Sequence, residues 1–319
     1  MSWFICALVA TFGWGLADLF YKKGTDEGDR FSHLKIAVQV GIVMGLVSLV
    51  IVVFVLPEFS FSSFVSNAVK YLPASLSYII SMVIGYAGLR YLEVSIISPV
   101  QNASGAFSMI VMLVFFLVKG TITSFFDEFS TLDVIGSVCI IIGVIVLAII
   151  QNKLSSDGEK VGKKYKYGAL ALIFPLLYCT FDTIGTAFDG IILNEETGLG
   201  LGEMEVLVLY GFTFLLAGIG CYIFMLIRGE VYNPFAVREL KTKTLAAVFE
   251  EFGQIFYVYA MAANPMLAAP MISSYCIISV ILSRLFIKEK LTKGQYVCII
   301  IVIVGIVLLG ISEGLSEGA

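Results

Sequence analysis

Hydrophobic residues in this chain are gathered into ten long runs that are separated by short polar connectors. A helix of about 18–25 apolar residues is long enough to cross a hydrocarbon core of roughly 30 Å. Because a span must satisfy its backbone hydrogen bonds internally, each run predicts a transmembrane helix. The predicted spans are 3–21, 34–56, 72–89, 94–118, 132–150, 167–188, 204–227, 244–263, 265–287 and 294–311. The expected fold class is therefore an all-α membrane protein with ten transmembrane helices.

The composition agrees with this pattern. Hydrophobic residues make up 59% of the 319 residues, charged residues make up 14%, and the mean hydropathy is +0.97. These values lie far from those of soluble globular domains. Every connector is too short to bury a core of its own, so we expect no soluble domain. Because Asp18 interrupts the first run and its lysines follow the run, we expect a retained span rather than a signal peptide.

Basic residues are sorted by connector. Of the 20 lysines and arginines, 18 lie in the odd-numbered connectors, and the even-numbered connectors hold only Lys70 and Lys119. The positive-inside rule therefore places the odd connectors in the cytoplasm and both termini outside. The acidic connector that holds Asp189, Glu195, Glu196 and Glu203 is expected outside. The location we predict is the plasma membrane of a bacterium.

Two sequence patterns of the first half of the chain recur in the second half. An aromatic residue precedes an aspartate by four positions, and a tyrosine precedes a proline by thirteen. The residues are Trp14, Asp18, Tyr86 and Pro99 in the first half, and Tyr178, Asp182, Tyr257 and Pro270 in the second. Five spans per half turn the second half upside down, as in many secondary transporters. We expect a first repeat at 1–151, a basic cytoplasmic linker at 152–166 and a second repeat at 167–312, inverted around a central cavity.

Acidic residues interrupt three of the predicted spans. Ionisable groups are costly in hydrocarbon, so they usually face a cavity or a partner. Glu250 and Gln254 share one helical face with Tyr257, whereas Glu251 points about 100° away from Glu250. One glutamate is therefore expected in the cavity, and the sequence leaves open which. Asp18 and Asp182 are candidates for the same cavity, although a helix cap and a packed carboxyl are the alternatives.

Aromatic and polar residues near these acids complete the predicted binding site. Aromatic faces attract organic cations, and Trp14, Tyr86, Tyr178, Tyr257 and Tyr275 could supply such faces. Gln101 and Asn102 follow Pro99 in the fourth span. Proline bends a helix and frees a carbonyl, so Pro99 and Pro270 are predicted to mark helix breaks and gates. Core packing and a seam of small residues are the alternative interpretations.

Several chemistries are disfavoured by what the sequence contains. The six cysteines are scattered without a CxxC pair, and His33 is the single histidine, so we expect no metal site and no histidine-based catalysis. The phosphate-binding pattern GxxxxGK[ST] is absent, which disfavours direct use of ATP by this chain. No array of basic and aromatic residues suggests a nucleic-acid partner. No cofactor is expected.

The C-terminal part of the chain carries a motif that resembles a known family. Arg284 is followed by Lys288-Glu289, Leu291-Thr292 and Gln295, and an apolar helix with Gly305 comes next. This stretch resembles the end of an EamA-type repeat of the drug/metabolite transporter superfamily, and Trp14-Gly15 with Lys22 is similar to the first span there. The first repeat departs from the pattern, since it has Leu-Val-Lys-Gly-Thr at 117–121. The resemblance implies two five-helix repeats and transport of amino acids, amines or related metabolites.

The function that we predict is secondary active or facilitative transport of a small cationic or zwitterionic metabolite by alternating access, with proton coupling as an option. The alternative within transport is uptake of a quaternary amine such as choline, for which a membrane potential supplies about 2.3 kcal/mol per charge per 100 mV. A receptor or assembly subunit and an intramembrane enzyme are more remote alternatives. No motif orders the acids for catalysis, so we expect no enzyme. The expected partners are the solute, the lipid bilayer and, in one alternative, protons; the oligomeric state is left open.

Overall fold

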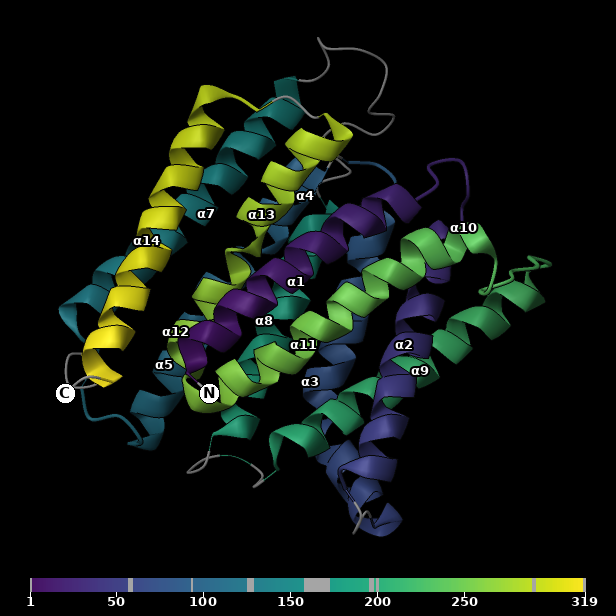
Figure 1. Ribbon diagram of the computed structural model, residues 1–319, viewed down its shortest axis with the longest axis horizontal. Coiled ribbons are helices and arrows are strands. Elements are labelled where there is room, and N and C mark those ends of the chain that lie inside the picture. The colour runs from purple at the N-terminus through teal and green to yellow at the C-terminus, as the bar shows by residue number, and fades with distance from the viewer. Residues whose placement is uncertain are drawn as a thin grey trace.

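The structure is a computed structural model that describes residues 2–56, 60–92, 94–124, 129–157, 173–194, 198, 201–288 and 291–317. Helices and short turns make up this part of the chain, with no strand among the described residues (Figure 1). Glu195, Glu196 and Glu289, together with residues 158–166 of the predicted linker, lie outside the described residues.

The helices follow the predicted order. Their bounds are α1 Trp3–Gly24, α2 Ser32–Phe54, α3 Phe61–Gly88, α4 Val94–Gln101, α5 Ser104–Lys119, α7 Thr131–Asp157, α8 Ile173–Leu193, α9 Glu203–Ile227, α10 Val237–Glu239, α11 Leu245–Ala263, α12 Pro265–Ser273, α13 Tyr275–Leu282 and α14 Lys293–Glu317. Two π-helical turns, Leu240–Thr244 and Ser283–Ile287, lie before α11 and after α13.

Nine helical stretches within the described residues are long and apolar enough to cross a membrane. The remaining predicted span, the eighth, corresponds to α11, whose 19 residues include Glu250, Glu251 and Gln254. These polar side chains lower the hydropathy of α11, but all three are buried inside the bundle. The prediction of an all-helical membrane fold is therefore confirmed, and the least apolar of its spans carries two buried glutamates.

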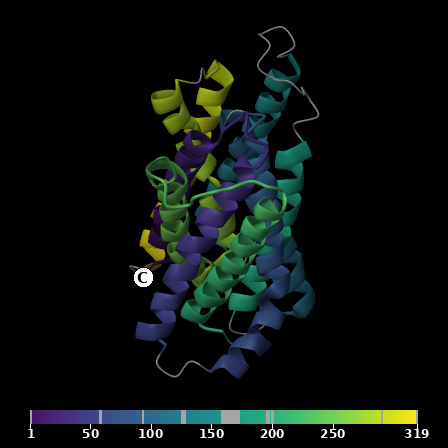
Figure 2. The ribbon, with the colours of Figure 1, turned by 90° about the vertical axis from the view of Figure 1, so that its right-hand side faces the viewer.

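The main helix pairs join the first half of the chain to the second. Helix α1 packs along α11 and α3 packs along α8, while α2 packs on α9 and α7 packs on α14 (Figures 1 and 2). By their order in the two halves, α1 corresponds to α8, α2 to α9, α3 to α11 and α7 to α14. The pairs α1–α11 and α3–α8 are therefore equivalent to each other, whereas α2–α9 and α7–α14 each join two corresponding helices. This pairing is the one expected of two related repeats. The inverted orientation of the second repeat stays a prediction.

The fourth and ninth spans are each built from two short helices. Helix α4 ends at Gln101 and α5 begins at Ser104, while α12 and α13 are separated by Ser274. The prolines lie inside α4 and α12, so the breaks follow Pro99 and Pro270 instead of falling on them. At the breaks, the side chains of Asn102 and Ser274 donate hydrogen bonds to the carbonyls of Ser98 and Met271, at 2.8 and 2.5 Å. Such side chains compete with the helical hydrogen-bond pattern of the backbone.

One sequence prediction about the outer connector is wrong. Helix α8 continues to Leu193, so Asp189 lies in its last turns and its exposed fraction is 0%. The hydroxyls of Tyr71 and Tyr257 donate hydrogen bonds to its two oxygens, at 2.8 and 3.0 Å. A buried carboxyl is tolerated when hydrogen bonds replace its water. The hydropathy pattern ended the span too early because it counted Asp189 as a solvated residue.

Candidate functional site

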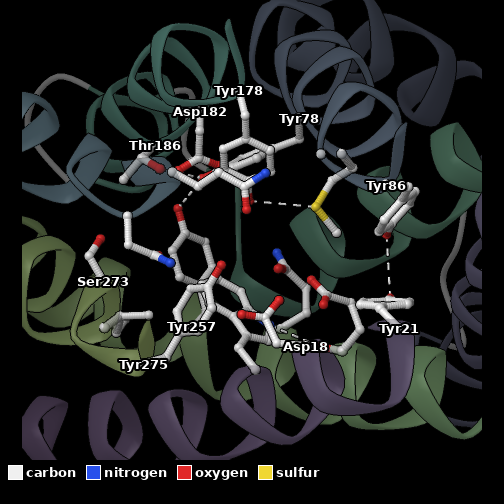
Figure 3. A pocket seen from close by; sticks show the side chains of 18 of the residues that line it. Asp18, Tyr21, Tyr78, Tyr86, Tyr178, Asp182, Thr186, Tyr257, Ser273 and Tyr275 are labelled. Carbon is white, nitrogen blue, oxygen red and sulfur yellow. Dashed lines mark hydrogen bonds between the residues drawn. The ribbon is translucent and has the colours of Figure 1, made fainter. Parts of the chain in front are cut away.

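A cavity lies at the centre of the bundle, between α1, α3, α8, α11 and the two broken spans (Figure 3). It offers about 50 Å³ of space to the centres of water molecules, which is room for roughly four waters. Eleven of the twelve predicted binding residues line it: Trp14, Asp18, Tyr86, Gln101, Asn102, Tyr178, Asp182, Glu250, Gln254, Tyr257 and Tyr275. The prediction that these side chains converge on one place agrees with this geometry, and their role in binding stays a prediction.

Glu251 is the one predicted binding residue that does not line the cavity. Its side chain is 5% exposed and lies on α11 next to Glu250, which does line the cavity. Successive residues of an α-helix point about 100° apart, so one of two adjacent glutamates must face a different neighbour. The geometry therefore separates the two glutamates, and it selects Glu250 as the carboxyl that faces the cavity.

Asp18 joins α1 to both broken spans. Its Oδ2 accepts hydrogen bonds from Ser98 of α4 at 2.6 Å and from Ser279 of α13 at 2.7 Å. Both serines are buried. Asp18 lies near the centre of the bundle and not at a solvated helix end, so the alternative of an interfacial cap is excluded by its position.

Asp182 occupies the facing wall of the cavity (Figure 3). Its Oδ2 accepts a hydrogen bond from Ser104, the first residue of α5, at 2.6 Å. The position of Ser104 depends on the break before α5. The interruption of the fourth span therefore places a hydroxyl donor at the carboxyl of α8.

Glu250 lies between an indole and a pair of tyrosines. Trp14 Nε1 donates a hydrogen bond to the Glu250 backbone carbonyl at 3.1 Å, which holds α1 against α11. The Tyr21 hydroxyl is close enough to hydrogen-bond the Glu250 carboxyl, and Tyr86 donates to the Tyr21 hydroxyl at 3.4 Å. The Trp14 ring also packs on Tyr257, with 5.1 Å between ring centroids.

Two amide groups in the cavity wall have unsatisfied donors. The Nε2 atoms of Gln101 and Gln254 are buried without a hydrogen-bond partner, and the two side chains are 5% and 1% exposed. An unpaired buried amide costs about 1–3 kcal/mol. A solute with an acceptor group such as a carboxylate or hydroxyl could remove this cost on binding.

The cavity is lined by three acidic side chains, those of Asp18, Asp182 and Glu250. No lysine, arginine or histidine is among the described residues that line it. Tyrosine rings and Trp14 cover much of the remaining wall. The described residues contain no group of three or more histidine, cysteine, aspartate or glutamate side chains that could hold a metal ion.

Sequence reasoning missed several lining residues, chiefly Tyr21, Tyr78, Thr186, Tyr210 and Ser273. Helical spacing could have indicated three of them. Tyr21 lies seven residues after Trp14, Tyr78 lies eight before Tyr86, and Thr186 lies four after Asp182, which are all positions on one helical face. Tyr210 and Ser273 depend on how the helices pack, and no local pattern indicates them.

Comparison with known proteins identifies similar sequence and fold. Residues 197–311 match the EamA-like transporter family. A protein of Methanocaldococcus jannaschii described as "Uncharacterized protein MJ1333.1" is 29% identical over 144 residues, which cover 45% of this chain and 98% of that protein. A solved structure described only as "Crystal structure of protein" has a TM-score of 0.59 and 12% identity, with 99% of this chain and 98% of that chain covered. At that identity the likeness concerns the fold alone.

The family match covers the end of the chain in which the sequence motif was found, and the matching structure covers both halves. The resemblance stated from the sequence is therefore confirmed over residues 197–311, which match the EamA-like transporter family, and the long apolar helices indicate an integral membrane protein.

Proposed function

We propose that this protein carries a small cationic or zwitterionic amine across the membrane by alternating access, with the central cavity as its binding site. The observation that carries the proposal is the charge of the cavity: three carboxyls face it, and no basic side chain is among its described lining residues. Buried carboxylates need compensation by a cation or by protons. An amine solute would supply that positive charge, and protons would supply it when the site is empty.

The rest of the wall narrows the chemistry of the solute. The faces of Trp14, Tyr178 and Tyr275 suit an ammonium group, since aromatic rings attract cations. The unpaired amides of Gln101 and Gln254 suit a hydrogen-bond acceptor at the other end of the solute. A zwitterion or a hydroxylated amine meets both conditions. A quaternary amine such as choline is the second candidate, which the aromatic wall favours.

The two helical hairpins next to the cavity are our candidates for the gates. Helix α11 joins α12 through Asn264, whose Oδ1 accepts a hydrogen bond from the Leu267 backbone N–H at 3.2 Å. At the other hairpin, Lys22 Nζ donates to the carbonyls of Leu89 and Leu92 at 2.6 and 3.0 Å, and so ties the end of α1 to the α3–α4 turn. Opening one hairpin while the other stays tied would expose the cavity to one side at a time.

A ligand screen tests the solute class. Purified protein is heated with amino acids, amines and quaternary amines, because a ligand that binds only the folded state raises the unfolding temperature. We expect stabilisation by amines with a carboxylate or hydroxyl and none by simple anions. Counterflow of the labelled hit in proteoliposomes then separates a transporter from a receptor. Stabilisation without counterflow would reject the transport proposal.

The matched pair Glu250→Gln and Glu251→Gln tests the site. Both change one buried carboxyl of α11, but only Glu250 lines the cavity. Loss of a charge-assisted contact of about 1.5–3 kcal/mol corresponds to roughly 10- to 150-fold weaker binding. We expect that loss for Glu250→Gln and a less than threefold change for Glu251→Gln. Equal effects of the two substitutions on the affinity for the screened amine would refute the assignment.

A further inference from the structure

Asp189 is a buried acid that does not line the central cavity and that the proposed function does not use. Its exposed fraction is 0%, and it lies four residues before the end of α8. At a rise of about 1.5 Å per residue, the carboxyl-bearing residue is about 6 Å from the helix end along the axis. The neighbouring Gly190 faces Pro265, which together with Asn194 lines a surface hollow of about 550 Å³. Asp189 is therefore closer to solvent at this end of the bundle than to the opposite membrane face.

A chain of hydroxyl groups connects Asp189 to the cavity. Tyr257 donates to Asp189 Oδ2 at 3.0 Å, the Tyr257 and Tyr78 hydroxyls hydrogen-bond each other, and the Tyr78 hydroxyl lies 3.0 Å from Thr186 Oγ1. Tyr78, Thr186 and Tyr257 all line the cavity. Tyr71 donates to the other carboxyl oxygen at 2.8 Å and is not among the residues that line the cavity. The chain thus runs from the cavity wall to a carboxyl beyond it.

The groups that face Asp189 come from four helices and include no cation. Tyr71 and Tyr78 belong to α3, Tyr257 to α11, and Asp182 is two turns earlier on α8. Tyr210 of α9 packs edge-on against Tyr78, with 5.6 Å between ring centroids. Among the described residues, then, the carboxyl is held by hydroxyl donors alone. Such a carboxylate has no compensating charge other than a proton that it could bind.

Counting hydrogens shows what a proton would change. With Asp189 ionised, Tyr71 and Tyr257 donate to it, Tyr78 donates to Tyr257, and Thr186 donates to Tyr78, so every hydroxyl is used once. A protonated Asp189 becomes a donor itself, and one of its tyrosines must accept. If that tyrosine is Tyr257, its hydrogen turns to Tyr78, and that of Tyr78 turns to Thr186. A proton on Oδ2 of Asp189, the oxygen that faces Tyr257, would thus reverse the chain of donors up to the cavity wall.

We propose that Asp189 is a proton-binding site outside the solute cavity, and that the Tyr257–Tyr78–Thr186 chain transmits its protonation to the cavity wall. The proposal goes beyond the proposed function and holds whatever solute is carried. It places a protonation site apart from the cavity carboxyls, at the end of the bundle where α8 terminates.

The test needs no substrate. Full-length protein in lipid nanodiscs is titrated with acid, and infrared difference spectra follow the protonation of carboxyl groups in the parent and in Asp189→Asn, Asp182→Asn, Glu250→Gln and Glu251→Gln. Fluorescence is followed in a Trp3→Phe background, where Trp14 is the single remaining tryptophan and its ring lies 5.1 Å from that of Tyr257. We expect a titrating carboxyl band and a fluorescence change with the same midpoint, both of which Asp189→Asn removes and Glu251→Gln leaves in place.

A second variant keeps the proposal testable if Asp189→Asn does not fold. Tyr71→Phe removes one donor to the carboxylate and leaves the cavity wall unchanged. Because a hydrogen bond to the charged form favours that form, its loss should move both midpoints to higher pH by about one unit. Midpoints that stay unchanged in Tyr71→Phe would overturn the proposal. So would signals that persist in Asp189→Asn and disappear in Asp182→Asn or Glu250→Gln.

Discussion

Asp18 and Asp182 occupy corresponding positions in the two halves, but their hydrogen-bond partners differ. Asp18 accepts from serines of α4 and α13, while Asp182 accepts from Ser104 of α5. One carboxyl therefore ties its helix to both broken spans, and the other ties its helix to one. Movement of the two broken spans relative to each other would therefore strain the pair of hydrogen bonds that Asp18 accepts.

A prediction at the residue scale concerns Asp29, in the connector between α1 and α2. Partial burial alone would raise the pKa of Asp29, but hydrogen bonds from Lys35 and the Phe31 backbone N–H outweigh it and hold the pKa below its ordinary value. A lowered pKa means that the stabilisation is present above about pH 4 and is lost as the pH falls through the folded-state value. Asp29→Asn should therefore cost up to about 1 kcal/mol at pH 7 and nothing well below pH 4.

Unfolding temperatures of the parent and of Asp29→Asn in detergent, measured at pH 7 and at pH 3, check this prediction. Glu27→Gln is the control, because the Glu27 side chain is 62% exposed and lies 3.8 Å from Lys22. A difference between the parent and Asp29→Asn that is the same at both pH values would contradict the expected role of the ionised Asp29.

Individual site residues could be predicted as far as helical spacing reaches. Glu250, Gln254 and Tyr257 share one face of α11 because of their sequence separation, and all three line the cavity. The choice between Glu250 and Glu251 depends on the rotation of α11 about its axis, which the packing against α1 fixes through the Trp14 hydrogen bond. Asp189 was missed for another reason: its donors, Tyr71 and Tyr257, lie far from it in the sequence.

At the scale of elements, the two broken spans approach each other closely where they cross. A Cβ atom at Gly105, in the first turn of α5, would lie 2.0 Å from Ser273 Oγ and 2.6 Å from the Ala269 carbonyl of α12. Small residues allow such close approach of helix backbones. The prolines predicted that these spans would be interrupted. The position of each break, however, depends on the side-chain hydrogen bonds of Asn102 and Ser274.

Gly105→Ala is therefore expected to force α5 and α12 apart. Overpacking of this kind costs about 1–3 kcal/mol, and the backbone carbonyl of Ala269 cannot rotate away as a side chain could. Gly220→Ala is the matched control, because a Cβ on that residue of α9 would have no neighbour within 4 Å. Unfolding of both variants in mixed micelles measures the difference. A Gly105→Ala protein as stable as Gly220→Ala would show that the crossing is looser than described.

At the scale of the whole molecule, the halves of the chain are interlocked. The pairs α1–α11, α3–α8, α2–α9 and α7–α14 each take one helix from either half, so each half exposes several buried faces when alone. The number of spans could be predicted from hydropathy, because it depends on local composition. The pairing could not, since it is decided by contacts between residues that are far apart in the chain.

This arrangement predicts that the protein can be divided but that neither part is stable alone. When the chain is produced as two separate parts, residues 1–160 and residues 161–319, the parts should co-purify as a complex. The complex should unfold at a lower temperature than the intact protein, because the covalent connection is lost. Each part produced alone should aggregate, because the faces of α1, α2, α3 and α7 that pack on the second half would lack partners. As a control, a protease site inserted in the predicted linker at 152–166 and cut after folding should leave two fragments that elute together. Monodisperse purification of either half without the other would show that the interfaces between the halves are dispensable for its folding.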